Sequence, residues 1–339
     1  SGVVQLLPGQ GETVGAQLTG DDRVRGVMFT GSTEVATLLQ RNIASRLDAQ
    51  GRPIPLIAET GGMNAMIVDS SALTEQVVID VLASAFDSAG QRCSALRVLC
   101  LQDEIADHTL KMLRGAMAEC RMGNPGRLTT DIGPVIDSEA KANIERHIQI
   151  MRSKGRPVFQ AVRENSEDAR EWQNGTFVAP TLIELDDFAE LQKEVFGPVL
   201  HVVRYNRNQL PELIEQINAS GYGLTLGVHT RIDETIAQVT GSAHVGNLYV
   251  NRNMVGAVVG VQPFGGEGLS GTGPKAGGPL YLYRLLANRP ESALAVTLAR
   301  QDAEYPVDAQ LKAALTQPLN ALREWAANRP ELQALCTQY

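Results

Sequence analysis

Residues 25–33 read Arg-Gly-Val-Met-Phe-Thr-Gly-Ser-Thr, an apolar run that ends at a glycine and a hydroxyl side chain. Its first part, residues 25–30, predicts a buried strand, and Ser32 is a natural N-cap for a helix that follows. Apolar residues between Val35 and Ile43 repeat at helical spacing. The next apolar run, residues 55–59, predicts a second strand. Because strand and helix alternate, this region favours an α/β fold with a parallel sheet.

The same alternation continues along most of the chain. Residues 256–278 hold too many glycines for a regular element and are predicted to be loop. Residues 279–339 are rich in Leu and Ala and predict helix. Further strands are predicted at residues 2–7, 65–68, 97–101, 224–228 and 248–250, and further helices at 12–18, 78–86, 105–116 and 139–151.

Composition is that of an ordinary globular protein. The chain has 339 residues, enough for two domains, of which 43% are hydrophobic and 20% charged. The net charge of −8 argues against nucleic acid or an anionic membrane as a main partner, because both attract clustered Lys and Arg. No apolar run reaches the roughly 20 residues that span a bilayer. The substrate we expect is a small molecule, on the grounds of the candidate residues and the family resemblance given below.

Cysteine and histidine spacing gives no metal or disulfide pattern. The four cysteines show no paired spacing, which argues against a disulfide framework or a zinc site and favours a reducing cytoplasm. The five histidines show no metal-ligand spacing either, so we predict no metal site.

Cys93 is the strongest candidate for chemistry. It lies in Gly-Gln-Arg-Cys-Ser, residues 90–94, directly after a predicted amphipathic helix. A free cysteine is commonly a small buried hydrophobic residue, and Cys100 in a predicted strand fits that interpretation. The polar, tightly turning surroundings of Cys93 set it apart, but from the residues alone a catalytic and a structural role both remain open.

Glu59 is the second candidate. A Glu at the end of a strand is commonly a surface residue, yet here Gly61 and Gly62 follow and allow the backbone to turn sharply. Together with Cys93 it would give a nucleophile and a general base, the groups needed for covalent chemistry on a carbonyl.

Three further segments are candidate ligand contacts. Gly31 and Ser32 begin a helix whose free N–H groups suit a phosphate, although an ordinary strand-to-helix turn explains the same residues. Glu194 and Phe196 lie on a Gly-Pro loop, where they could hold a ribose and face a flat ring; a turn with one core Phe is the alternative. Phe264 precedes two glycines and could wall a pocket, or lie in a flexible surface loop.

Taken together, these segments resemble the aldehyde dehydrogenase superfamily. Ser94 after Cys93 and the run 256–260 resemble, more narrowly, the L-glutamate γ-semialdehyde (Δ1-pyrroline-5-carboxylate) dehydrogenases, including the dehydrogenase portion of the bifunctional bacterial proline utilization A proteins. The matching motifs, which follow the family order across roughly residues 1–278, are Phe-Thr-Gly-Ser-Thr-Glu (29–34), Glu-Thr-Gly-Gly (59–62), Gly-Gln-Arg-Cys-Ser (90–94), Glu-Val-Phe-Gly-Pro-Val (194–199) and Pro-Phe-Gly-Gly-Glu-Gly-Leu-Ser-Gly (263–271).

The resemblance implies an architecture and a cofactor. It implies the remnant of a Rossmann-like parallel sheet in an NAD-binding domain at residues 1–61, an α/β catalytic domain at 62–278 and a helical extension at 279–339. NAD would be the cofactor, and FAD would belong only to a proline dehydrogenase domain that this chain does not contain and that the full-length protein could carry. The family also suggests a homo-oligomer.

The resemblance assigns roles residue by residue. Cys93 would be the nucleophile, and Glu59 would be the general base that activates water. The reaction would be the NAD-dependent oxidation of L-glutamate γ-semialdehyde to L-glutamate through a Cys93 thioester, the second step of proline catabolism. Cofactor contacts would come from Gly31, Ser32, Gly61, Glu194 and Phe196, and substrate contacts from Ser94, from the backbone of Gly256 and Ala257, and from the rings of Phe264 and Phe86.

The chain departs from the family pattern at its start. The Asn of the family's oxyanion site and the Lys that binds the adenosine ribose lie upstream of the segment where this chain begins. We therefore expect a fragment with little activity of its own. Another semialdehyde dehydrogenase, such as one for succinate semialdehyde, and a non-catalytic structural fragment are the other readings.

Overall fold

The computed structural model describes residues 2–48, 51, 53–161, 175–256, 258, 260–286, 316, 320 and 324. The chain divides into one compact unit at residues 1–285 and a second at 286–339, and the fold described below is that of the first unit. Almost all of the helical extension expected at residues 279–339 lies outside the described residues; within it, Leu282–Leu285 form a 3-10 turn.

Seven strands form the main sheet, in the order β10-β9-β3-β4-β7-β6-β5. Neighbouring strands are parallel except that β5 runs antiparallel to β6. The α/β fold with a parallel sheet, predicted from the alternation of elements, is confirmed. The strands are β3 (Ala65–Val68), β4 (Val98–Gln102), β5 (Val158–Gln160), β6 (Thr181–Leu185), β7 (Val199–Tyr205), β9 (Thr225–His229) and β10 (Asn247–Val250).

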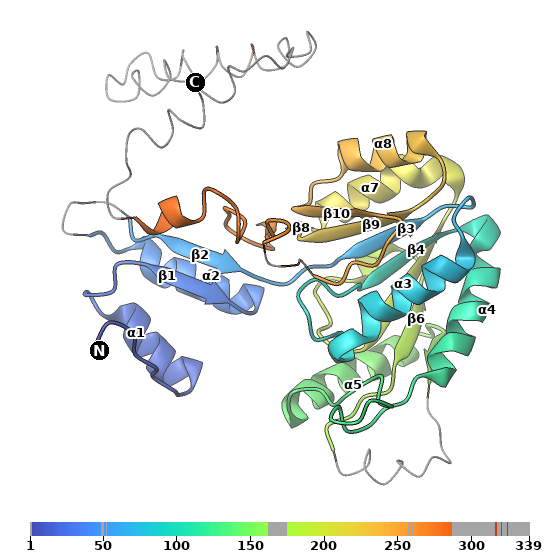
Figure 1. Cartoon of the computed structure of the whole chain (residues 1–339), viewed down its shortest axis with the longest axis horizontal. Helices are drawn as coiled ribbons and strands as arrows, with labels where there is room; N and C mark the ends of the chain where they lie inside the picture. The colour runs from blue at the N-terminus through green and yellow to red at the C-terminus, as the bar shows by residue number, and fades with distance from the viewer. Residues whose placement is uncertain are drawn as a thin grey trace. The chain divides into compact units, whose positions relative to one another are not determined.

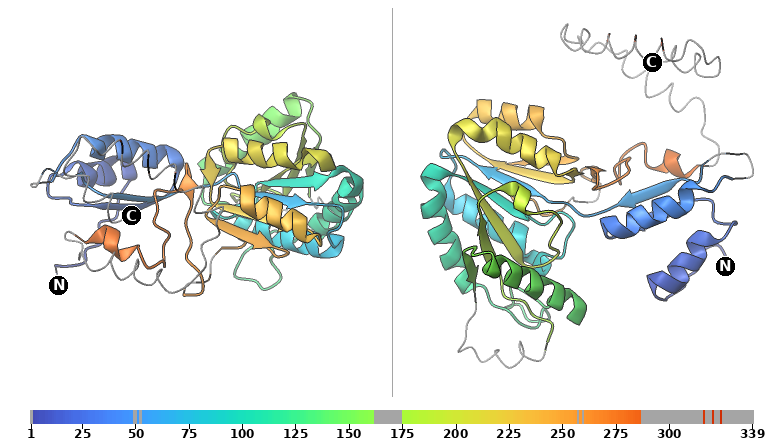
Figure 2. Two further views of the ribbon diagram at one scale, coloured as in Figure 1. Left: turned by 90° about the horizontal axis from the view of Figure 1, so that it is seen from above. Right: turned by 180° about the vertical axis from the view of Figure 1, so that it is seen from behind.

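Helices cover both faces of this sheet. α3 (Thr74–Phe86) and α4 (Asp103–Glu119) pack side by side on one face, and α7 (Leu210–Ala219) lies against the other (Figures 1 and 2). The buried residues of α4 fall at helical spacing, from Ala106 through Leu110 and Leu113 to Met117, so one stripe of the helix faces the sheet. The remaining long helices are α5 (Ser138–Ser153) and α8 (Asp233–Ser242).

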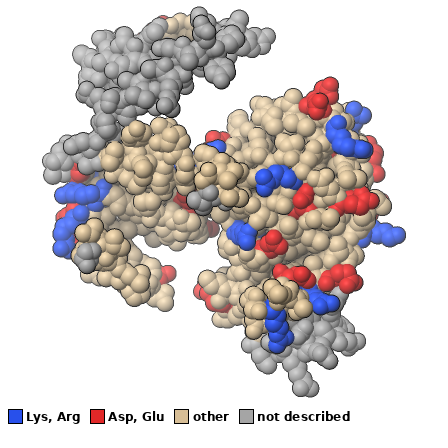
Figure 3. Space-filling view, in the orientation of Figure 1, with Lys and Arg blue, Asp and Glu red and all other residues tan. Residues whose placement is uncertain are grey.

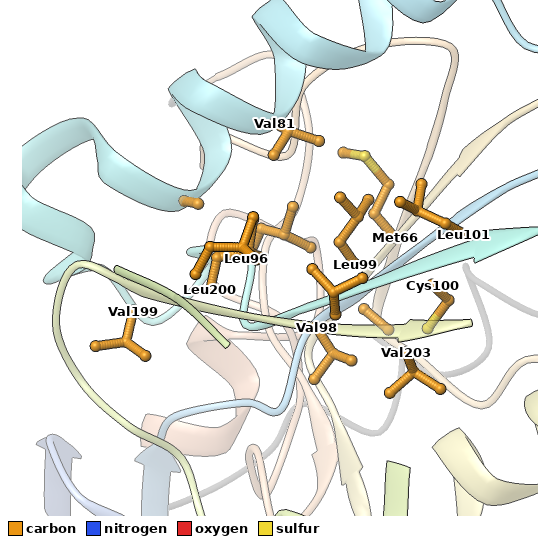
Figure 4. Close-up of a cluster of buried hydrophobic side chains, with 14 of the residues drawn as sticks. Met66, Val81, Leu96, Val98, Leu99, Cys100, Leu101, Val199, Leu200 and Val203 are labelled. Atoms are coloured by element: carbon orange, nitrogen blue, oxygen red, sulfur yellow. The ribbon is translucent and has the colours of Figure 1, made fainter. Parts of the chain in front are cut away.

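The core lies between the sheet and its helices. Strands β3 and β4 are buried along their whole length, as expected where helices cover both faces of a parallel sheet. Figure 4 shows Met66 of β3 and Leu99 of β4 beside Val81 of α3, and all three side chains are fully buried. Burying each such side chain contributes roughly 1.5–3 kcal/mol. This core fixes the strand ends from which the candidate site is built.

A second, smaller sheet carries Glu59. It consists of the parallel strands β1 (Val27–Thr30) and β2 (Leu56–Glu59), with Thr30 opposite Glu59, and α2 (Thr33–Ala44) packs against it. The Ser32 side chain accepts a hydrogen bond of 3.2 Å from the Val35 N–H, so the predicted N-cap is confirmed.

A late segment of the chain pairs with the free edge of β2. The N–H of Thr60 donates to the Ser270 carbonyl at 3.0 Å, and the N–H of Thr272 donates to the Ala58 carbonyl at 2.9 Å. The glycine-rich loop that was predicted at residues 256–278 therefore lies beside Glu59. It contains the short strand β11 (Glu267–Gly268), which pairs with β8 (Tyr222–Gly223).

Two local predictions near the N-terminus are corrected or refined. The strand predicted at residues 2–7 is wrong, because this segment is irregular and the side chains of Val3, Val4 and Leu6 are 85–90% exposed. β-Branched residues favour a strand only where a neighbouring strand takes up their backbone bonds, and no described strand does so here. The helix predicted at 12–18 is a π-helical turn at Gly11–Gly15 followed by α1 (Ala16–Gly20).

Charged side chains of both signs are mixed over the face seen in Figure 3. In the part of the chain that the structure describes, no helix combines the length and the apolar composition that crossing a bilayer requires.

Candidate active site

A cavity of about 700 Å³ brings most of the predicted site residues together. They come from the N-terminus of α2, from the C-terminal end of β2, from the turn before β4 and from two loops near β7 and β11. The predicted residues that line the cavity are Gly31, Ser32, Glu59, Gly61, Cys93, Ser94, Glu194, Phe196, Gly256 and Phe264.

The turn before Cys93 has an unusual backbone. After α3 ends at Phe86, Ser88, Ala89 and Gly90 all have left-handed φ angles, of 56°, 54° and 65°. For residues other than glycine this conformation costs about 1–2 kcal/mol each. At Gly90 an added Cβ would also overlap the carbonyl oxygen of Gly197. The turn is therefore a specific backbone arrangement that the surrounding contacts must hold.

Asn64 holds the residues on either side of the nucleophile candidate. Its side-chain amide donates to the carbonyls of Cys93 at 2.7 Å and Ala95 at 2.9 Å, and its oxygen accepts from the Thr225 N–H at 3.2 Å. The Ser94 hydroxyl oxygen accepts the Gly256 N–H at 3.2 Å. These bonds fix Cys93 at the cavity wall and join the Gly256 loop to it.

The surroundings of Cys93 favour its protonated thiol. Burial raises the pKa of Cys93 and the carboxylate of Glu194 raises it further, while the backbone N–H groups of Ser94 and Cys93, and then Arg97, act in the opposite direction. Since the thiolate is the nucleophilic form, a base must take the proton before Cys93 can attack.

The surroundings of Glu59 raise the pKa of its carboxyl group towards neutrality. Burial raises the pKa of the Glu59 carboxyl to about 7, and a backbone N–H of Gly266 offsets part of this shift. The carboxyl lies between glycines, because a Cβ added at Gly265 or Gly271 would crowd it. Its buried Oε1 has no hydrogen-bond partner. A carboxyl group with a pKa near neutrality can both take up and release a proton at neutral pH.

Glu194 is held by a buried arginine that we did not predict. Arg97 is 2% exposed, and its Nε and Nη2 donate to Glu194 Oε1 at 3.1 and 2.9 Å. The other Glu194 oxygen lies so close to Gly61 that a side chain there would overlap it. Phe196 is 47% exposed, with the Arg97 guanidinium 5.2 Å from its ring centre. This corner of the cavity is therefore built by a glycine, an ion pair and an aromatic ring.

The N-terminus of α2 lies at the cavity and could bind a nucleotide. Residues 30–34, the turn that begins the helix, line the cavity. The first N–H groups of a helix lack partners within it and carry a partial positive charge. The residues present therefore fit a nucleotide cofactor on this side of the cavity.

One predicted residue, Phe86, does not reach the cavity, and another, Ala257, cannot be placed beside the rest. Phe86 is 2% exposed and belongs to the main core, so the structure does not bring it to the cavity wall. Ala257 lies outside the described residues. Two residues of the site, Asn64 and Arg97, were not predicted from the sequence. Each is a polar residue directly before an apolar run, 65–68 for Asn64 and 98–101 for Arg97, and that position was a signal in both cases.

Comparison with known proteins agrees with this geometry. The model of the aldehyde dehydrogenase family matches residues 1–287. The chain belongs to the aldehyde dehydrogenase family. This confirms the resemblance that the five motifs carried.

Individual relatives narrow the likeness within the family. The chain is 98% identical over 338 residues to the bifunctional protein PutA of Escherichia coli strain K12, covering 100% of this chain and 26% of that protein. It is 36% identical over 284 residues to the 1-pyrroline-5-carboxylate dehydrogenase of Geobacillus kaustophilus, covering 83% of this chain and 53% of that protein. The crystal structure of a Thermus 1-pyrroline-5-carboxylate dehydrogenase with bound NAD matches with a TM-score of 0.75 and 37% identity, over 84% of this chain and 53% of the other. The chain thus spans about a quarter of the PutA relative and about half of the dehydrogenases.

Proposed function

We propose that this chain carries the catalytic residues of an NAD-dependent dehydrogenase that oxidises L-glutamate γ-semialdehyde to L-glutamate. The observation that supports this most directly is that Cys93 and Glu59, 34 positions apart in sequence, line one cavity. Relatives named 1-pyrroline-5-carboxylate dehydrogenase support the substrate, and the NAD in the Thermus structure supports the cofactor.

The chain's own groups suffice for the proton steps. Glu59, with a pKa of about 7, takes the proton from Cys93 directly or through water. The thiolate then forms a bond to the aldehyde carbon, and the carbonyl oxygen becomes an oxyanion. NAD, when bound, supplies the acceptor for the hydride that leaves this carbon. Glu59 then releases the thiol proton to solvent and, as the carboxylate, deprotonates the water that attacks the thioester on Cys93. The Cys93 thiolate leaves, and L-glutamate is the product.

The cavity divides between cofactor and substrate in this proposal. Gly31 and Ser32 at the start of α2 hold the nucleotide, and Glu194 binds the ribose, with Gly61 and Phe196 beside the nicotinamide. On the other side, Ser94 and the backbone N–H groups of Gly256 and Ala257 hold the α-carboxylate, while Phe264 packs on the aliphatic chain. The Gly256 N–H donates to the Ser94 hydroxyl oxygen at 3.2 Å, so the two groups are adjacent, and in this proposal that N–H turns from Ser94 to the carboxylate when substrate binds.

The wider expectations remain proposals for this chain. We propose an NAD-binding part at residues 1–61 and a catalytic part at 62–278. We also propose that the enzyme is located in the cytoplasm. We further propose that the 339-residue chain binds NAD weakly, since the sheet beside the α2 site has two strands in the described residues. A proline dehydrogenase domain with FAD would belong to a full-length protein like the PutA relatives.

Trapping the acyl group on Cys93 tests the reaction. With NAD and L-glutamate γ-semialdehyde, the Glu59→Gln variant should form the glutamyl thioester on the Cys93 peptide slowly, because solvent must then take the thiol proton. It should retain this adduct in mass spectra, because no base activates water for its hydrolysis. Cys93→Ala should show no adduct, and Cys120→Ala, the matched control at another thiol, should leave the adduct unchanged. NADH formation by Cys93→Ala at the unmodified rate would overturn the proposal.

Ser94→Ala tests the substrate. Loss of the hydroxyl should raise KM for L-glutamate γ-semialdehyde by about tenfold, the usual cost of one hydrogen bond to a charged group, and should leave KM for propanal unchanged. Equal shifts for both aldehydes would point to another semialdehyde dehydrogenase.

A further inference from the structure

The Arg97 side chain is fully used by the protein itself. It is 2% exposed, and all five of its N–H groups have acceptors. Nε and one N–H of Nη2 bond to Glu194. The remaining three bond to backbone carbonyls, those of Gly90 at 2.7 Å, Arg92 at 2.9 Å and Gly197 at 3.3 Å. No donor is left over for a substrate, so any role of Arg97 in the reaction must act through other residues.

Those acceptors belong to two loops that meet at the cavity. The carbonyls of Gly90 and Arg92 flank the backbone turn that presents Cys93. Glu194 and the Gly197 carbonyl belong to the loop before β7, 97 residues and more along the chain. A planar guanidinium can satisfy both loops only if they keep one mutual geometry, which an ammonium group would not enforce.

The same guanidinium also contributes to the field at the thiol. The charges that act on Cys93 are the Glu194 carboxylate, which disfavours the thiolate, and the Arg97 guanidinium, which favours it. Tyr249 of β10 is near enough to be influenced by Cys93, and Arg92 and Glu59 line the same cavity. Because Arg97 pairs with Glu194, each partner limits the effect of the other on the sulfur.

We propose that Arg97 is a positioning residue of this active site, which locks the Cys93 turn to the Glu194 loop and balances the Glu194 charge at the nucleophile. The proposal rests on the function assigned above to Cys93 and Glu194. It assigns Arg97 no contact with substrate or cofactor. A buried ion pair is by itself weak evidence for stabilisation. The positioning role therefore offers a functional reason for the buried pair of Arg97 and Glu194.

The test is the pH profile of Cys93 alkylation by iodoacetamide, read from the Cys93 peptide by mass spectrometry. This measurement needs neither NAD nor aldehyde, so it can fail or succeed independently of the proposed reaction. Arg97→Met should slow alkylation at neutral pH by about tenfold, because the sulfur then loses the cation that favours its thiolate. Glu194→Gln should accelerate it by a similar factor. The double variant Arg97→Met/Glu194→Gln should return to within about threefold of the parent chain, as coupled partners do.

Arg97→Met and Glu194→Gln should change the alkylation rate in opposite directions, and this contrast decides the outcome. If Arg97 were only structural, both variants would loosen the same turn and shift alkylation in the same direction, which would overturn the proposal. Arg97→Lys should give an alkylation rate between those of the parent chain and Arg97→Met, since the charge remains but the planar fork that joins the two loops is lost. Arg114→Met is the matched control, because Arg114 also pairs with a glutamate, Glu184, and neither residue lines the cavity. If Arg97→Met does not fold, the other two variants still test the proposal. Glu194→Gln should alkylate faster than the double variant, from which the Arg97 charge has also been removed.

Discussion

The carboxyl group of Glu59 occupies a setting that favours its protonated form. Burial raises the pKa of this group to about 7 in the folded chain, against an ordinary value of 4.5. The folded state therefore holds the proton more tightly than the unfolded state, and stability decreases as pH rises from 4.5 to 7. Glu59→Gln, which imitates the protonated form, should be more stable than the parent above pH 7.

Thermal melting at two pH values checks this prediction. At pH 8 the Glu59→Gln chain should gain on the order of 1 kcal/mol, a figure reduced because the cavity leaves the carboxyl partly exposed. At pH 4 the gain should vanish. Glu145→Gln on the exposed side of α5 serves as the control and should change neither melt. A gain of equal size at both pH values would show that the pKa shift is not the cause.

Gly61 is the glycine on which the Glu194 corner depends. A Cβ there would overlap a Glu194 carboxylate oxygen, and moving that carboxylate breaks its pair with Arg97. Gly61→Ala should therefore lower the free energy of unfolding by about 2–4 kcal/mol, measured by urea denaturation. Gly115→Ala on α4 is the control, because the space around it is open and alanine favours a helix by up to about 1 kcal/mol. A Gly61→Ala chain as stable as the parent would contradict the packing described.

Among the elements, the three-residue left-handed turn before Cys93 makes the sharpest demand on sequence. Gly90 and Gly155 both have positive φ, 65° and 77°, but only Gly90 has backbone atoms where a Cβ would go. Gly155→Ala should thus cost about 1 kcal/mol of backbone strain, and Gly90→Ala should cost at least about 2 kcal/mol more. Equilibrium unfolding in urea measures both, and equal losses would mean that the Gly197 carbonyl moves aside freely.

Elements that bury a continuous apolar face could be predicted from the sequence, and those that depend on distant partners could not. β3 was predicted at its observed bounds because residues 65–68 are apolar on both faces. The supposed strand at 2–7 is also mostly apolar, but no described strand lies beside it. For the site, Cys93 and Glu59 stood out by their local surroundings. Arg97 did not stand out, because its structural role depends on an ion pair with Glu194, which lies 97 positions further along the chain.

On the scale of the whole molecule, the small sheet leaves apolar surface uncovered. Met28 of β1 is 55% exposed and Leu38 of α2 is 56% exposed, and β1 pairs with β2 alone among the described strands. An open strand edge next to apolar side chains promotes association. Sedimentation velocity should therefore show association that grows with concentration, and Leu38→Gln should weaken it. Leu128→Gln, at a fully exposed loop residue elsewhere, should not. A single monomeric species at every concentration would contradict this.

The pairing of β2 with residues 269–272 has a consequence for the timing of synthesis. The backbone partners Ala58 and Thr272 are 214 positions apart. A nascent chain leaving the ribosome displays Glu59 long before the glycines that enclose it have been translated. The Glu59 carboxyl therefore acquires its raised pKa only after nearly the whole compact unit has been made, and the proposed pairing of Glu59 with Cys93 is incomplete until then.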